Sequence, residues 1–415
     1  LKSGPAKLPR RLVAVGDSVF VTLGYKAPVT ALDAATGKTL LTYEGTAGTE
    51  GLIVSDGVLF ANVIEDLETP VFKPKDPFVW NEAARARLID KWIRGGHRQS
   101  VAAFEAKTGD LLWRKQYPVA PLSLGADKES VYFSDGQKII SLRRDNGEQR
   151  WQSEPVAAVT EYTSQYAPTL VIYEDVILYS PNVSSIVALD ARDGSVLWKS
   201  KHPRAGHHSP GDVLVVNDLV WSGGTGAGPF VGKNLLTGKV EVSFQPPEMT
   251  WFHPRCHRSK ATDLYVLASR TGIEFADVRK KEVNVNHWTR GACVYGIMPC
   301  NGLIYTPPNP CACLHETKTT GFNAFAPASD EPLREVPNEK RLEKGPAYGH
   351  IEDEASAGSR DADWPMYRHD TERSGFVPSD VSASLKQAWQ TEIGGKLSSL
   401  VSAGGKVLAV SIDAH

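Results

Sequence analysis

A short turn motif that recurs along the chain is the feature that most limits what this sequence can fold into. Each copy ends in glycine, and in most copies a large apolar residue follows four positions later. The copies are Asp33–Gly37, Glu105–Gly109, Arg143–Gly147, Asp190–Gly194 and Asn234–Gly238, followed by Leu41, Trp113, Trp151, Trp198 and Val242. The glycines lie 72, 38, 47 and 44 residues apart, and a period of about 40–50 residues is typical of a four-stranded propeller blade.

Each residue type in the motif has a physical role in such a blade. An Asp at its start can accept hydrogen bonds from the amides of its own turn, and the glycine supplies the positive φ that a tight hairpin needs. The Trp is expected on the outer strand, packed between neighbouring blades with its indole N–H on a carbonyl. We therefore predict structural roles for Asp33, Gly37, Gly109, Trp113, Gly147, Trp151, Asp190, Gly194, Trp198 and Gly238.

A second pattern, of short apolar strand pairs joined by polar turns, occurs eight times. The pairs cover Leu12–Val21, Leu52–Ala61, Leu122–Ser134, Leu170–Ser180, Val213–Ser222, Leu264–Phe275, Ile297–Pro307 and Leu400–Val410. Such segments, rich in β-branched and aromatic residues, are hairpin signals. The sequence therefore predicts an all-β protein, a β-propeller of about eight four-stranded blades, of which the last is incomplete.

Two segments interrupt the blades. Residues 76–94 are predicted to be a helical insertion, because Trp80, Ala84, Leu88 and Trp92 are spaced to form one apolar stripe. Residues 328–362 are charged and poor in apolar side chains, which is typical of a linker or a long surface loop. The expected organisation is blades over 1–327, this linker, and the start of a further or closing blade over 363–415.

The charge and hydropathy of the chain argue against nucleic acid or an anionic membrane surface as a partner, and against a membrane-spanning helix. The net charge of −2 gives no electrostatic reason to expect nucleic acid or an anionic membrane surface. No apolar run approaches the ~20 residues of a membrane-spanning helix. The chain begins at Leu1 without a leader peptide, so we expect it to be processed, trimmed or part of a longer protein.

The Asp-x-x-Thr-Gly-x-x-x-Trp repeats resemble those of the quinoprotein (PQQ-like) β-propeller repeat family. Asp363–Arg368 with Arg373-Ser-Gly375 is similar to a Trp-x-x-x-Arg…Gly segment that opens many bacterial members. The block from Cys256 to Pro327 resembles uncharacterised PQQ-binding-like propeller proteins of planctomycete-type bacteria. The resemblance implies either a calcium- and quinone-dependent dehydrogenase or, as in an outer-membrane assembly lipoprotein of the superfamily, a module that binds protein without a cofactor.

The dehydrogenases of this superfamily imply features that the sequence lacks. They usually carry two adjacent cysteines over the quinone, whereas Cys311-Ala-Cys313 has a residue between them. No motif assigns an Asp or Glu to the Ca²⁺ that such enzymes hold with oxygen ligands. The Cys-x-x-Cys-His of haem-linked relatives is absent. The cofactor is left unknown, with PQQ and Ca²⁺ as the one candidate.

All five cysteines fall in one region, which indicates a local constraint. They are Cys256, Cys293, Cys300, Cys311 and Cys313. Cys256, Cys293, Cys311 and Cys313 are disulfide candidates, because cysteines of exported proteins are usually paired. A metal site and buried free thiols are the alternatives.

Histidines and a basic aromatic segment gather in the middle of the chain, partly overlapping the cysteine region. His202, His207, His208, His253, His257 and His287 fall between the fourth and sixth blades, and Trp251–Arg258 joins aromatic to cationic groups. The residues predicted to bind a ligand are His207, His208, Trp251, His253, Arg255, His257 and Arg258. Convergent imidazoles would suit a metal or acid–base site, and an Arg would grip a carboxylate or sulfate. The alternatives are unconnected loop histidines and a packed corner between blades.

Arg143 and Arg144 are expected to be a solvated pair.

The function predicted from these patterns is an extracytoplasmic, periplasmic binding or scaffold module. Its partner is expected to be a protein or a small-molecule or carbohydrate ligand on the loop face. The alternative is a PQQ-dependent oxidoreductase, of the alcohol or sugar dehydrogenase type, with an atypical pocket. A hydrolase or lyase acting on polysaccharide is a third class. No residue is assigned a catalytic role, because no nucleophile or phosphate-loop motif is present.

Overall fold

The computed structural model describes the blades in detail and the C-terminal region in short stretches. It describes residues 11–24, 26–66, 98–156, 168–181, 185–202, 212–224, 228–248, 257–268, 270–286, 289–292, 296–308, 321–328, 337, 363–364, 374, 376, 378, 384, 386–390, 397–398, 400–403 and 406–410. Two compact units, Leu1–Ala328 and Ser329–His415, are described separately. Strands make up the regular structure of the described residues, and none of these residues is in an α-helix. The predicted helical insertion, residues 76–94, and most of the expected linker lie outside them.

The first unit contains six antiparallel four-stranded sheets, each with its strands in chain order. Blade 1 has β1 (Leu12–Val15), β2 (Ser18–Thr22), β3 (Val29–Asp33) and β4 (Thr39–Thr42); blade 2 has β5 (Thr49–Ser55), β6 (Val58–Ile64), β7 (Gln99–Glu105) and β8 (Leu111–Gln116). Blade 3 has β9 (Gly125–Ala126), β10 (Ser130–Ser134), β11 (Ile139–Arg143) and β12 (Gln149–Gln152); blade 4 has β13 (Thr169–Tyr173), β14 (Val176–Ser180), β15 (Ser185–Asp190) and β16 (Val196–Lys201). Blade 5 has β17 (Leu214–Val216), β18 (Leu219–Gly223), β19 (Phe230–Asn234) and β20 (Val240–Phe244); blade 6 has β21 (Lys260–Ala261), β22 (Tyr265–Ala268), β23 (Glu274–Asp277) and β24 (Glu282–Asn284).

Two smaller sheets complete the described strands. Blade 7 has β25 (Met298–Cys300), β26 (Leu303–Thr306) and β27 (Asn323–Phe325). In the second unit, β28 (Val401–Ala403) pairs with β29 (Lys406–Leu408), and Trp364 forms a bridge to Ser402. The prediction of an all-β propeller built from repeated blades is confirmed.

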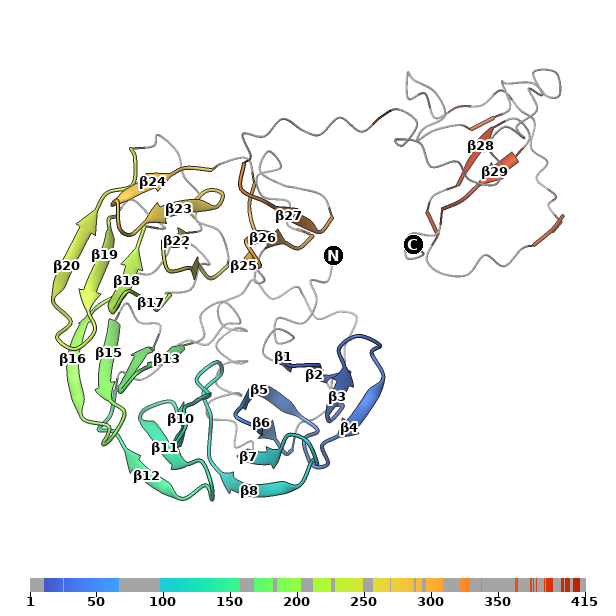
Figure 1. Ribbon diagram of the computed structural model, residues 1–415. Coiled ribbons are helices and arrows are strands. Elements are labelled where there is room, and N and C mark those ends of the chain that lie inside the picture. Colours follow the sequence, from blue (N-terminus) through green and yellow to red (C-terminus); the bar gives the residue numbers. More distant parts are fainter. Residues whose placement is uncertain are drawn as a thin grey trace. The chain divides into compact units, whose positions relative to one another are not determined.

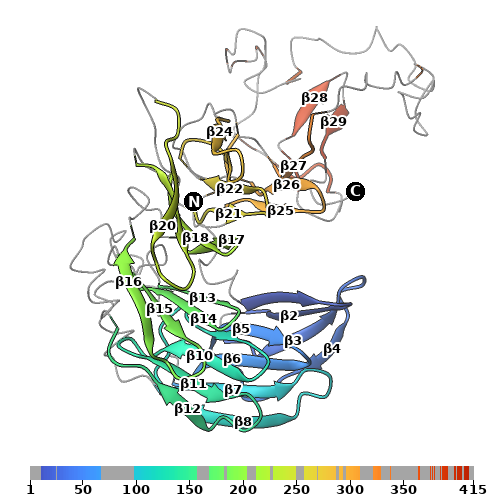
Figure 2. The ribbon, with the colours of Figure 1, turned by 60° about the vertical axis from the view of Figure 1, so that its left-hand side comes forward.

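Successive blades of the first unit follow one another with the first strand innermost and the fourth outermost (Figures 1 and 2). The first strands contact one another across the seams: β1 lies against β5, β5 against β9 and β9 against β13, and β17 lies against β21 and β21 against β25. This order places the outer strands, which begin just after the glycine turns, at the rim of the molecule.

The tryptophans of the repeat join each blade to the next. The indole of Trp113 donates to the carbonyl of Arg144 at 2.8 Å, that of Trp151 to Ala191 at 2.9 Å, and that of Trp198 to Leu235 at 2.7 Å. Each ring also covers the turn glycine of the next blade: a Cβ on Gly147, Gly194 or Gly238 would lie within 2.6 Å of it. These glycines therefore provide both a positive φ and room for the ring.

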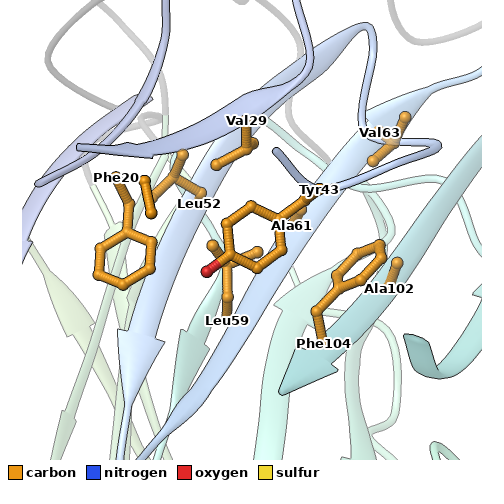
Figure 3. Close-up of a cluster of buried hydrophobic side chains, with 10 residues drawn as sticks. Phe20, Val29, Tyr43, Leu52, Leu59, Ala61, Val63, Ala102 and Phe104 are labelled. Atoms are coloured by element: carbon orange, nitrogen blue, oxygen red, sulfur yellow. The ribbon is translucent and has the colours of Figure 1, made fainter. Parts of the chain in front are cut away.

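Blades 1 and 5 lack this Trp and use an aromatic ring two residues farther along the chain, just after β4 in blade 1 and at the end of β20 in blade 5. Tyr43 is fully buried between blades 1 and 2 with Phe20, Leu59 and Phe104 (Figure 3), and its hydroxyl donates to the carbonyl of Ala106 at 2.5 Å. Phe244 stacks on Phe230 with ring centroids 5.2 Å apart and packs against the core shared with blade 6. Because side chains alternate along a strand, a shift of two residues keeps the ring on the same face.

The two ends of the sheets differ in the length of their connections. At one end, here called the turn end, strands 1–2 and 3–4 of blades 1 to 6 are joined by two to five residues. At the other, the loop end, connections include Glu65–Arg98 between β6 and β7, His202–Val213 between blades 4 and 5, and Gln245–Ser259 between blades 5 and 6. Long connections therefore leave the sheets at one end only.

Candidate functional site at the loop end of blades 4 to 6

Two of the seven residues predicted to bind a ligand, His257 and Arg258, belong to the described part of the chain. They immediately precede β21, at the loop end. His207, His208, Trp251, His253 and Arg255 lie outside the described residues, as do Cys256, Cys293, Cys311 and Cys313. Cys300, on β25, is a half-buried free thiol.

Arg258 joins the inner strands of three blades. Its Nη1 donates to the hydroxyl of Thr169, the first residue of β13, at 2.5 Å. The same nitrogen lies 3.7 Å from the carboxylate of Asp212, just before β17. The backbone N–H of Ser259 donates to the other oxygen of that carboxylate at 2.5 Å. Blades 4, 5 and 6 are thus held together where their first strands begin.

Burial determines the electrostatics of this cluster. It raises the pKa of Asp212, opposed by the positive charge of Arg258. It lowers the pKa of Arg258, opposed by Asp212, and lowers the pKa of Lys260 on β21. Each shift disfavours the charged form, as expected where water is scarce. The ion pair is therefore sensitive to the loss of either partner.

Two further buried groups lie beside this ion pair. His202, which directly follows β16, is 2% exposed, and burial together with the nearby charge of Lys233 lowers its pKa to about 4. Lys233 donates to the hydroxyl of Ser200 and the carbonyl of Lys201, both at 2.7 Å. His257, also 2% exposed, places its Nδ1 3.2 Å from the Arg258 carbonyl, to which it donates. At neutral pH His202 is uncharged and does not serve as a cationic anchor.

The described residues around Arg258 form a packed corner between blades 4, 5 and 6. This corner fixes the ends of the two long connections that precede blades 5 and 6. Its cations contact carbonyl, hydroxyl and carboxylate oxygens of the protein itself. Sequence reasoning singled out Arg258 and His202 but missed Asp212, Thr169 and Lys260. An Asp among loop residues carries no signal in the sequence, because only the fold brings it to Arg258.

The described residues do not supply a cluster of side chains for the Ca²⁺ of the dehydrogenases. Among them, no three His, Cys, Asp or Glu side chains lie close enough to hold a metal ion. The buried carboxylate of Glu274 accepts the backbone N–H groups of Arg270, Thr271 and Gly272 at 2.8, 2.8 and 3.1 Å. Those oxygens therefore close a loop of blade 6 through the amides of the protein itself. No helix within the described residues is long and apolar enough to cross a membrane.

Comparisons with known proteins agree with the repeat pattern. A family model described as outer membrane protein assembly factor BamB matches residues 3–180 and 97–247. A curated relative from Rickettsia prowazekii (strain Madrid E), an uncharacterised protein RP232, is 20% identical over 191 residues. That match covers 40% of this chain and 45% of the relative, so the chain spans less than half of the relative's length.

Solved structures of similar proteins include natural and designed propellers. BamB from Moraxella catarrhalis matches with 14% identity, a TM-score of 0.48, and coverage of 72% of this chain and 83% of its own. The computationally designed Ika8 protein matches with 13% identity, a TM-score of 0.49, and coverage of 76% and 83%. The quinohemoprotein alcohol dehydrogenase ADHIIG from Pseudomonas putida HK5 matches with 12% identity, a TM-score of 0.35, and coverage of 76% and 54%. All three TM-scores are below 0.5, so the family model carries the assignment.

Proposed function

Because this chain belongs to the family of the outer membrane protein assembly factor BamB, we propose that it is an extracytoplasmic propeller that binds a protein partner and acts as a scaffold. Recognition is assigned to the loop end, where His207, His208, Trp251, His253 and Arg255 occur in the connections. His257 and Arg258 end the second of these connections, just before blade 6. Residues 363–415 are proposed to be the start of a further blade.

The observation that carries this proposal is the uneven length of the connections. The turn end uses two to five residues per connection in blades 1 to 6, whereas connections of 12 and 15 residues precede blades 5 and 6 at the loop end. Long loops on a rigid scaffold are where binding residues usually lie. The Arg258–Asp212 contact holds the ends of both of these loops.

Photocrosslinking in cells of the source organism tests the position of the partner. A photoreactive phenylalanine analogue would replace His207 or Arg255 at the loop end and, as the matched control, Asp193 or Lys38 in turns of blades 4 and 1. We expect one discrete protein adduct from the loop-end positions and none from the turns. Equal adducts from all four positions would contradict the assignment.

An alkaline phosphatase fusion tests the compartment, because that enzyme needs disulfides that form outside the cytoplasm. The full open reading frame, fused at its C-terminus, should give an active phosphatase. An inactive phosphatase from a fusion that accumulates to normal levels would contradict an extracytoplasmic location.

A dye-linked assay with added PQQ and Ca²⁺ tests the dehydrogenase alternative. The purified chain should give neither a change in quinone absorbance nor turnover of alcohols and sugars. Steady turnover of an alcohol or a sugar would contradict the scaffold proposal and indicate that the chain is a quinone-dependent oxidoreductase.

A further inference from the structure

Blade 3 departs from the chain's own repeat at three positions, each time to arginine. Arg143 opens the turn that begins with Asp33, Glu105, Asp190, Asn234 and Asp277 in the other blades. Arg144 follows it where the others have Ala34, Ala106, Ala191, Leu235 and Val278. Arg150 stands where blades 1, 2 and 4 have Leu40, Leu112 and Leu197 and where blade 5 has Glu241. The three-residue turn between β9 and β10 adds Lys128. All four cations lie at the turn end of one blade.

The exchange at Arg143 removes a stabilising contact from the turn. In blade 1, the carboxylate of Asp33 accepts the hydroxyl of Thr36 at 2.6 Å and its backbone N–H at 2.8 Å, and these contacts lower the pKa of Asp33. An arginine has no acceptor; its side chain in blade 3 is 54% exposed, with Asp145 at 3.5 Å. Positions that break a local rule without a local gain are expected at functional sites.

Arg144 is not part of a solvated pair, and that expectation was wrong. Its side chain is only 12% exposed. It donates to the hydroxyl of Ser55 at 3.0 Å and the carbonyl of Asp127 at 2.8 Å, and it lies over the ring of Phe60 with 5.2 Å to the centroid. The guanidinium therefore bridges blades 2 and 3 and gives the seam a fixed positive charge.

A groove of about 600 Å³ follows this seam. Val58 and Leu112 of blade 2 form its apolar side, and Lys128, Arg143, Arg144 and Arg150 of blade 3 form its cationic side. Leu112 is 45% exposed although it is apolar. Glu129 and Asp145 also line the groove, so the lining holds four cations and two carboxylates; Asp56 lies 4.0 Å from Arg144.

The carboxylates of the groove are held in exposed ion pairs that an incoming acid can replace. Arg150 pairs with Glu129 at 2.8 Å, where the glutamate side chain is 74% exposed. Such surface pairs contribute only about 0–1 kcal/mol, so exchange of one carboxylate for another has little cost. Lys128 is exposed on the same side.

We propose that this groove binds an extended acidic segment of a protein partner. Carboxylates of the segment would lie on Lys128, Arg143 and Arg150, and an apolar side chain would lie over Leu112 and Val58. An extended segment fits because β8, which carries Leu112, is the outermost strand of its sheet (Figure 1), and outer strands accept further strands. The site is at the turn end and is independent of the loop-end proposal.

Fluorescence anisotropy with a fluorescein-labelled peptide of alternating Asp and Val tests the site. The test variant is Lys128→Glu with Arg143→Glu, and the matched control is Lys199→Glu with Lys239→Glu, which changes exposed lysines of blades 4 and 5 by the same total charge. We expect the test variant to weaken binding at least about tenfold and the control to change it less than about twofold, because close charge pairs dominate such coupling. Leu112→Ser, which keeps the charge, should weaken binding about threefold.

Three outcomes would overturn the proposal. They are equal loss of binding in test and control variants, equal binding of a Lys–Val peptide, and binding of anionic phospholipid vesicles with none of the acidic peptide. Circular dichroism and urea titration would show that each variant is folded. Because loop-end crosslinking uses other residues, failure here leaves that experiment unaffected.

Discussion

At the scale of single residues, the glycine that ends each repeat has two separate roles in this propeller. All five repeat glycines have a positive φ. In blades 3, 4 and 5 the glycine also lies under a Trp of the preceding blade, whereas a Cβ on Gly37 in blade 1 would meet nothing within 4 Å. The chain therefore contains a matched pair of positions that separates backbone strain from packing.

Replacing Gly194 by Ala should destabilise the protein more than replacing Gly37 by Ala. Both residues have similar φ, +77° and +70°, so both substitutions have the left-handed backbone cost of roughly 1 kcal/mol. Only at Gly194 would the new methyl group meet the Trp151 ring, at 2.5 Å, adding about 1–3 kcal/mol of overpacking. Urea titration gives the free energy of unfolding of each variant. Equal losses of stability in the two variants would contradict the close packing of the Trp151 ring on Gly194.

His202 should make stability fall in acid. Its folded pKa of about 4 lies below the usual value of about 6.5, so the unfolded chain binds the proton first as pH falls. The contribution is present above pH ~6.5 and is lost progressively down to pH ~4, by up to roughly 3 kcal/mol. His202→Gln should remove this part of the pH dependence in urea titrations between those values. An unchanged slope would show that other groups are responsible.

At the scale of elements, the turn of blade 6 has a lysine where five other turns have glycine. Lys281 has φ +61° and follows Asp277, whose carboxylate accepts the N–H groups of Arg279 and Lys280 at 2.9 and 2.8 Å. No Trp of blade 5 has to be accommodated here, because Val242 occupies that position and Phe244 packs instead. A side chain is therefore tolerated, at the cost of backbone strain.

Lys281→Gly should stabilise the protein by about 0.5–1 kcal/mol. The free energy gained by removing left-handed backbone strain should exceed the free energy lost because glycine makes the unfolded chain more flexible. Thermal unfolding followed by circular dichroism would record the change as a higher Tm. Lys280→Gly, beside it and without a positive φ, is the control and should be neutral or slightly destabilising. A lower Tm for Lys281→Gly would show that its side chain has a packing role.

The sequence predicts those elements best whose contacts are local. The turns and the Trp positions follow from short spacings, so Trp113, Trp151 and Trp198 could be placed on outer strands. Tyr43 and Phe244 could not be recognised as their equivalents, because their role depends on the neighbouring blade. In blade 6 the predicted hairpin Leu264–Phe275 spans the second strand and the start of the third, since the inner strand is only Lys260–Ala261 and has no apolar pattern.

At the scale of the whole molecule, a partly buried ion pair connects blades whose contacting residues lie far apart in the sequence. Arg258, Asp212 and Thr169 come from three successive blade starts. No spacing rule relates such residues, which is why the corner could not be predicted although Arg258 was singled out. We expect their contact to couple the stabilities of blades 4, 5 and 6.

Arg258→Met should destabilise the protein by about 1–3 kcal/mol, because it leaves the mostly buried Asp212 carboxylate with the charge of Lys260 alone. Asp212→Asn keeps the acceptor for the Ser259 amide, so it should cost less, and the double variant should be more stable than the sum of the two changes implies. Urea titrations of the four proteins give the coupling. Strict additivity would mean that the two groups do not interact.

The contrast between the two ends of the sheets also has an evolutionary consequence. The Trp–carbonyl contacts join the blades beside the five-residue turns, so an insertion there would separate one blade from the next. At the opposite end, a connection can lengthen or shorten without moving those contacts. Descendants of such a chain can therefore acquire new binding partners by indels at one end, while the other end preserves the architecture.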